Sequence, residues 1–154
     1  MELKKYLILI IVLNFTNFLY ADIIKPAENL TAYDVVKIQL TALKNNNKPS
    51  KNTGIKQTWI FAHPENKKYT GPFSNFKAMI SDSSYKILLN SLKFQTKLVT
   101  KDNKSAKYLV VVDAYDNKRY QLQWILEKAK LNKDCKNCWM TTTVTQPQFI
   151  GQLN

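Results

Sequence analysis

The spacing of apolar residues divides this chain into a helical first half and a second half of strands. Early in the chain, "LTAYDVVKIQLTALKNNN" repeats apolar residues every three or four positions, as one face of a helix does: Leu30, Tyr33, Val36, Leu40 and Leu43. This pattern predicts a helix over about 31–45. Thr31 is expected to be its N-cap, with Asp34 in the capping-box position, and the asparagines after Lys44 are expected to end it.

Three shorter segments complete the first half. We predict a second helix over about 56–62 that ends near His63, because the residue before a proline avoids helical geometry. "KKYTGPF" is typical of a turn built on Gly71 and Pro72, and Pro72 suits the first turn of a third helix over about 73–81. "SSYKILLN" predicts one more short helix or turn.

From Leu92 the period changes to two, which indicates strands. Alternation from Leu92 to Leu98 predicts the first strand, and three more are expected over about 108–115, 120–126 and 139–145. Short connections permit antiparallel pairing, and helices grouped on one side of an antiparallel sheet make an α+β domain. The predicted fold is therefore α+β, with N-terminal helices packed on a four-stranded antiparallel sheet.

The beginning of the chain, "MELKKYLILIIVLNFTNFLYAD", has the pattern of a secretory signal peptide. Lys4 and Lys5 precede an apolar run from Tyr6 to Leu13, and Ala21 offers a small residue for cleavage. A membrane anchor would need roughly 20 mostly apolar residues. We therefore expect residues 1–21 to be removed and residues 22–154 to form a single domain, exported to a bacterial periplasm or secreted.

The chain is strongly basic, with a formal charge of +12, but 22 of its 23 basic residues are lysines and one is Arg119. Recognition of nucleic acids and phosphates favours the forked guanidinium of arginine. The composition therefore indicates a solvated lysine surface and no nucleic-acid partner. Weak attraction to an anionic membrane surface is a second interpretation of the same charge.

Cys135 and Cys138 are the two cysteines of the chain. A redox pair of the thioredoxin kind has a cysteine at a helix N-terminus, whereas "WMTTTVT" after this pair indicates a strand. A zinc site needs three or four protein ligands, and His63 is the sole other candidate of that kind. A structural disulfide is the favoured interpretation for an exported protein, and no metal or cofactor is expected. The segment between the cysteines must then turn, because a fully extended one would separate them by about 10 Å.

Three side chains are weak catalytic candidates. His63, the single imidazole, could act as a general base, but its position before Pro64 favours a surface or helix-capping role. Asp113 and Glu127 lie on neighbouring predicted strands and could form a carboxylate dyad. The simpler interpretation is that both face solvent or pair with lysine or Arg119 across the sheet.

Aromatic residues from both halves of the chain could line a pocket. The candidates are Trp59, Phe61 and Tyr69 from the helical half, and Trp124 and Trp139 from adjacent strands. Aromatic side chains at such positions more often belong to an ordinary core.

Three stretches, "YDVVKIQLTALKNNN", "GIKQTWIFAHPENKKYTGPFSNFKAMI" and "CWMT", together resemble the bacterial family known as domain of unknown function 4864 (DUF4864). The resemblance covers roughly Ala32 to Val144. It implies an α+β fold similar to the nuclear-transport-factor-2-like (NTF2-like, cystatin-like) superfamily, in which a curved sheet wraps helices into a cone with an internal pocket. It implies no activity. The family usually has Ser where this chain has His63, and Cys135 is an addition, so neither residue inherits a role.

The sequence therefore predicts an exported, non-catalytic module that binds a small apolar or weakly anionic ligand in the cone or pairs with another protein, a homodimer included. The alternative is an NTF2-like enzyme of the isomerase, dehydratase or hydrolase type that uses Asp113, Glu127 or His63. A third interpretation is an envelope-associated protein held by lysine charge.

Overall fold

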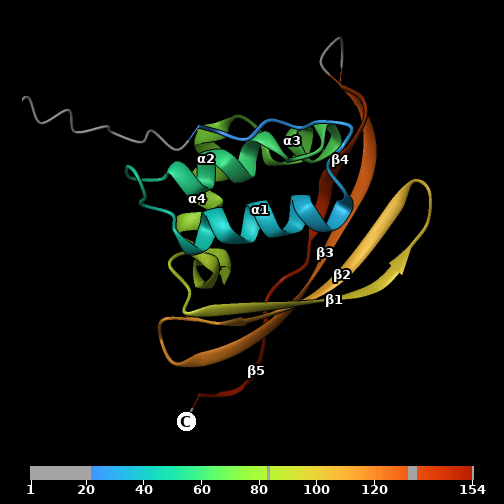
Figure 1. Cartoon of the computed structure of the whole chain (residues 1–154). Coiled ribbons are helices and arrows are strands. Elements are labelled where there is room, and N and C mark those ends of the chain that lie inside the picture. Colours follow the sequence, from blue (N-terminus) through green and yellow to red (C-terminus); the bar gives the residue numbers. More distant parts are fainter. Residues whose placement is uncertain (1–21, 83, 132–134, 154) are drawn as a thin grey trace, which may run out of the picture.

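The structure, a computed structural model, describes residues 22–82, 84–131 and 135–153. It has an α+β fold, as predicted, in which the helices gather on one side of a curved antiparallel sheet (Figure 1). The predicted signal peptide lies outside the described residues. Within the described part of the chain, no helix is both long enough and apolar enough to cross a membrane.

The helical elements come first. They are α1 (Ala32–Lys44), α2 (Thr53–Ile60), α3 (Pro64–Thr70), α4 (Phe73–Asp82) and the short 3-10 helix η1 (Ser84–Leu88). The strands follow as β1 (Lys93–Lys101), β2 (Ser105–Asp113), β3 (Lys118–Leu131), β4 (Cys135–Val144) and β5 (Gln148–Gln152).

The first helix matches its prediction closely. The Thr31 hydroxyl accepts a hydrogen bond from the Asp34 backbone N–H, and the Asp34 carboxylate accepts one from the Thr31 N–H, which completes the capping box. Val36, Leu40 and Leu43 are buried as the period requires. Tyr33 is the exception, because 47% of its surface stays exposed.

The next helices differ from the prediction. The second helix lies earlier than expected, at Thr53–Ile60, and residues 67–70, the first part of the segment expected to be a turn, belong to α3. Gly71 and Pro72, on which the turn was predicted, lie between α3 and α4. α3 has no buried residue, so it lacks the apolar periodicity on which the prediction depended. Its ends carry clear local signals: Pro64 occupies the first turn, and Gly71 ends the helix with a φ of +73°.

The sheet has the order β1-β2-β3-β4 with antiparallel pairing throughout, and β2 extends over Ser105–Asp113 instead of 108–115. β5 adds an unpredicted fifth strand. It pairs with the first residues of β3, and β4 pairs with the later ones, so β4 and β5 follow each other along the same edge of β3. The sequence did not reveal β5 because four of its five residues are exposed, which leaves no alternating pattern.

Residues Phe61–His63, between α2 and α3, lie along the outer edge of β4. Thr141 N–H donates to the Phe61 carbonyl, and His63 N–H donates to the Thr141 carbonyl, both at 2.8 Å. This parallel bridge covers part of the strand edge and holds α3 against β4.

Cys135 and Cys138 form the predicted disulfide, with their Cα atoms 5.8 Å apart. The prediction that β4 begins at Trp139 is wrong, because the strand already begins at Cys135. The pairing is irregular there. Ala129 pairs with Cys138 and Leu131 pairs with Cys135, so a step of two residues on β3 corresponds to a step of three residues on β4. The extra residue on β4 forms a β-bulge. The bulge bends the strand, which brings the two cysteines close enough for a disulfide.

Candidate functional site

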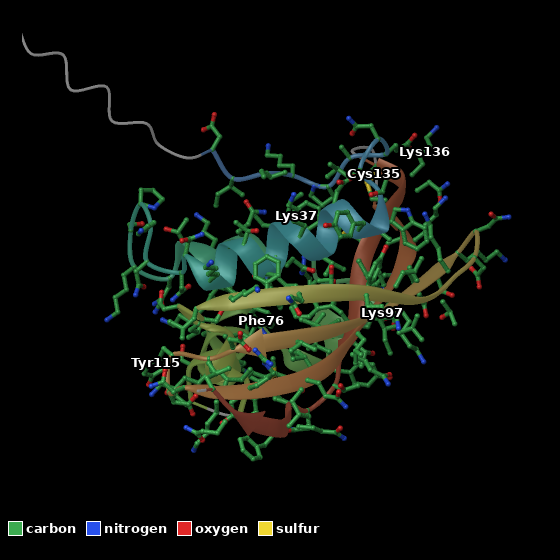
Figure 2. All side chains as sticks on the ribbon, turned by 60° about the horizontal axis from the view of Figure 1, so that its bottom comes forward. Lys37, Phe76, Lys97, Tyr115, Cys135 and Lys136 are labelled. Carbon is green, nitrogen blue, oxygen red and sulfur yellow. A yellow bond between two sulfur atoms is a disulfide. The ribbon has the colours of Figure 1, made fainter. Side chains whose placement is uncertain are left out.

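A cavity of about 270 Å³ lies between the helices and the β3–β4 side of the sheet. The residues around it come from all five helical segments, two strands and the connection between α2 and α3. They are Gln39, Leu43, Thr58, Ala62, Asn66, Tyr69, Thr70, Phe76, Met79, Ile80, Tyr85, Leu88, Trp124, Thr141, Thr142, Thr143 and Val144. In Figure 2 the labelled Phe76 lies behind the sheet, on the helical side where this cavity is found.

The inner wall of the cavity carries a closed polar network. Trp124 Nε1 donates to Gln39 Oε1 and Thr141 Oγ1, both at 3.0 Å, and Thr141 Oγ1 donates to Gln39 Oε1 at 2.6 Å. Gln39 Nε2 donates to the Thr58 carbonyl at 3.0 Å. Gln39, Trp124 and Thr141 are at most 3% exposed, so this network joins α1 to the sheet without contact with solvent.

The outer wall is the face of α3 formed by Asn66, Tyr69 and Thr70. Asn66 Nδ2 donates to the Thr142 carbonyl at 2.9 Å, which attaches α3 to β4. Asn66 Oδ1 is buried and accepts no hydrogen bond from a described group. Tyr69 is 89% exposed although it lines the cavity, so its ring stands at the open end.

The cavity lining is electrically neutral. All of its residues are described, and none of them is an Asp, Glu, Lys, Arg, His or Cys. Its titratable groups are the phenols of Tyr69 and Tyr85. Burial raises the pKa of Tyr85, which donates to the Val144 carbonyl at 2.9 Å. An acidic group that loses hydration here therefore keeps its proton, so negative charge is disfavoured in this part of the molecule.

Two of the five predicted aromatic pocket residues, Tyr69 and Trp124, line the cavity, and the other three do not. Phe61 is fully buried in the core. Trp59 lies one layer outside the cavity, with its ring 5.0 Å from that of Phe76 and Lys67 Nζ 5.0 Å from the indole centroid. Burial lowers the pKa of Lys67 at this position.

Trp139, the last of the predicted pocket residues, packs beneath two lysines. Lys101 Nζ and Lys128 Nζ lie 5.9 Å and 5.3 Å from its ring centroid. Lys128 is its cross-strand neighbour on β3, and Lys101 ends β1. Trp139 therefore forms cation–π contacts near the disulfide end of the sheet and is not among the residues that line this cavity.

The sequence reasoning missed Gln39, Thr141 and Asn66. A signal for Gln39 was present, because it stands four residues after Val35 and four before Leu43, on the buried face of α1. A glutamine on such a face must find internal hydrogen-bond partners. Asn66 and Thr141 carried no comparable signal, since their positions depend on the contact between α3 and β4.

The catalytic candidates are apart from the cavity and from one another. His63 is the N-cap of α3, and its Nδ1 accepts from the Glu65 N–H at 3.1 Å, which confirms the capping interpretation. Asp113 and Glu127 lie at opposite ends of the β2–β3 pair, opposite Arg119 and Ser105 respectively, so the structure does not bring them together as a dyad.

Asp113 forms an ion pair with Arg119, one of the partners that the sequence offered it. Arg119 Nε donates to Asp113 Oδ1 at 2.6 Å, and a second guanidinium nitrogen donates to Oδ2 at 3.0 Å. This fork lowers the pKa of the Asp113 carboxyl. Among residues 22–82, 84–131 and 135–153, no group of three or more His, Cys, Asp or Glu side chains could hold a metal ion.

Comparison with known proteins does not identify this chain: no family model, no curated protein and no solved structure matches it.

Proposed function

We propose that this protein is a non-catalytic module that binds a small uncharged molecule in the cavity between α3 and the β3–β4 pair. One observation carries this proposal: the cavity is lined by apolar groups and neutral polar groups, with no ionisable side chain except two tyrosines. Ligand pockets are concave and mostly apolar with a few polar groups, and this cavity has that composition. A dry cavity of about 150 Å³ can hold benzene, so this one suits a ligand of about ten non-hydrogen atoms.

The same proposal includes the NTF2-like form of the α+β fold, the kinship with DUF4864 and export. A curved antiparallel sheet with helices over one face is compatible with an NTF2-like cone. The Cys135–Cys138 disulfide is compatible with an oxidising compartment. The enzyme alternative gains no comparable support, because the side chains proposed for it, His63, Asp113 and Glu127, are absent from the cavity lining.

Calorimetric titration of the mature protein with 4-propylphenol, a neutral molecule of suitable size, tests the proposal. We expect a dissociation constant of about 1 mM or tighter. Ala62, the smallest side chain of the lining, provides the blocking variant: Ala62→Leu should weaken binding at least about tenfold because the added carbons occupy ligand space.

The matched control is Ala78→Leu, the same change at an exposed position of α4 outside the cavity lining, which should leave binding unchanged. Thermal unfolding of both variants verifies that they remain folded. An absence of binding to the wild-type protein, or equal binding by Ala62→Leu, would contradict the proposal.

A further inference from the structure

Most of the hydroxyl and indole donors that line the cavity are already in use within the protein. The hydroxyl of Thr58 donates to the Gly54 carbonyl at 2.9 Å, that of Thr70 to the Asn66 carbonyl at 3.0 Å, and that of Thr142 to the Ile125 carbonyl at 3.2 Å. The Trp124 indole, the Thr141 hydroxyl and one hydrogen of each amide, Gln39 and Asn66, are also engaged within the protein. A threonine hydroxyl that donates its single hydrogen still offers oxygen lone pairs, so these side chains can meet a ligand as acceptors.

Asn66 contributes a further acceptor that no described group of the protein uses. The Thr142 carbonyl can only accept a hydrogen bond, so the donor nitrogen of the Asn66 amide, Nδ2, must face it. Oδ1 is left buried, and no described group donates to it. A buried acceptor without a donor is costly for the folded state, so a bound molecule that donates to Asn66 would gain free energy beyond that of apolar contact.

Charge narrows the choice of ligand. No lining residue carries a positive charge, so an anion would lose its hydration without gaining a cationic partner, and the acceptor groups of the wall would repel it. A cation would meet acceptors, but it would leave water for a cavity inside a chain of formal charge +12. A neutral donor avoids both costs.

We infer that the cavity selects an uncharged, mainly apolar molecule that donates a hydrogen bond, with Asn66 Oδ1 as its principal acceptor; phenols, indoles and short apolar alcohols belong to this chemical class. The inference rests on the proposed function and deepens it. It also narrows the sequence-based prediction of an apolar or weakly anionic ligand to the neutral case.

Two isomers of equal size provide the test: 4-propylphenol donates a hydrogen bond, whereas 4-ethylanisole can only accept one. Titrated into the mature wild-type protein at neutral pH, the phenol should bind about tenfold more tightly, which is the difference expected for one buried hydrogen bond. The anion 3-phenylpropionate should bind more weakly than either isomer.

Asn66→Leu keeps a side chain of similar size without the acceptor, and it should reduce the preference for the phenol to less than about threefold. Asn75→Leu, on the exposed part of α4 and outside the cavity lining, is the matched control and should retain the full preference. In addition, the side-chain amide signals of Asn66 in a nuclear magnetic resonance spectrum should shift with 4-propylphenol and much less with 4-ethylanisole.

The outcomes separate the two proposals. Equal binding of both isomers to the wild-type protein would overturn the inference and leave a cavity that binds neutral ligands, whereas tighter binding of 3-phenylpropionate would contradict both proposals. A preference for the phenol that survives in Asn66→Leu would overturn the assignment of Asn66 as the acceptor. If neither neutral isomer binds, the proposed function itself fails.

Discussion

Gly54 shows how a single residue determines the distance between two helices. A Cβ atom built on Gly54 would lie 2.0 Å from the Ala42 carbonyl oxygen and 2.8 Å from the Asn46 Cα, so the missing side chain lets α2 approach the backbone of α1. Asn46 then completes the junction, because its side-chain oxygen accepts from the Ile55 N–H at 3.0 Å. Thr58 and Gln39, which line the cavity, lie on these two helices, so the junction also positions the cavity wall.

We therefore expect Gly54→Ala to lower the free energy of unfolding by about 3 kcal/mol or more, because the atoms in the way belong to backbone that cannot rotate aside. Urea unfolding followed by tryptophan fluorescence measures the loss. Gly151→Ala is the control: a Cβ there has no atom within 4 Å, and the change should be smaller than about 1 kcal/mol. Similar values for both substitutions would contradict this account of the junction.

At the scale of the element, α1 is specified by its own ends and by one buried face. The capping box binds the N-terminal N–H groups, and the pKa of Asp34 is lowered chiefly by its hydrogen bonds with Thr31. α3 is the opposite case. It has caps but no buried residue, and it depends on Asn66 and the Phe61–His63 bridge for its place against β4.

The lowered pKa of Asp34 predicts a pH-dependent contribution to stability. Because the folded-state pKa is below the unfolded value of about 3.9, the stabilisation is complete above about pH 4 and is lost as pH falls through the folded pKa. Asp34→Asn should therefore be less stable than wild type at pH 7, and the difference should shrink toward pH 2. Urea unfolding across this pH range is the measurement.

Glu127→Gln, at an exposed carboxylate for which no described hydrogen bond is found, is the control for that series. Thr31→Ala removes the other half of the capping box and should cost about 1 kcal/mol at pH 7. A difference between wild type and Asp34→Asn that stays constant from pH 7 to pH 2 would be inconsistent with an ionised cap.

At the scale of the whole molecule, positive charge is spread over many elements. Figure 2 shows Lys37, Lys97 and Lys136 on α1, β1 and β4, well separated from one another. Among the described residues, three basic side chains pair with a carboxylate: Lys68, Lys118 and Arg119. Most of the lysines therefore contribute to a diffuse field rather than to a local site.

This field predicts weak, salt-sensitive attraction to anionic surfaces. The mature protein should sediment with vesicles that contain one quarter phosphatidylglycerol at low salt, and most of it should be released as the salt concentration passes about 0.15 M, where the screening length is about 8 Å. Vesicles of phosphatidylcholine alone are the control and should bind little at any salt concentration. Binding that persists at 1 M salt would indicate a different mode of attachment.

The sequence by itself determined the elements whose signals are local. The capped α1, the alternating strands and the disulfide could be predicted because helix period, strand period and cysteine spacing report which residues must be buried or joined. Neighbouring residues also gave signals for two side chains. The adjacent strands offered Arg119 as a partner for Asp113, and the position of His63 before Pro64 indicated a helix cap.

Only the tertiary structure decided the rest. α3 and β5 bury too little apolar surface to show a period, so their existence depends on β4 and β3 as partners. The cavity and its neutral lining exist only because seven elements converge there. Trp59, Phe61 and Trp139, which the sequence analysis placed in a pocket, pack elsewhere in the molecule. Periodicity tells which face of an element is buried, whereas the neighbours that this face meets are determined by packing across the whole chain.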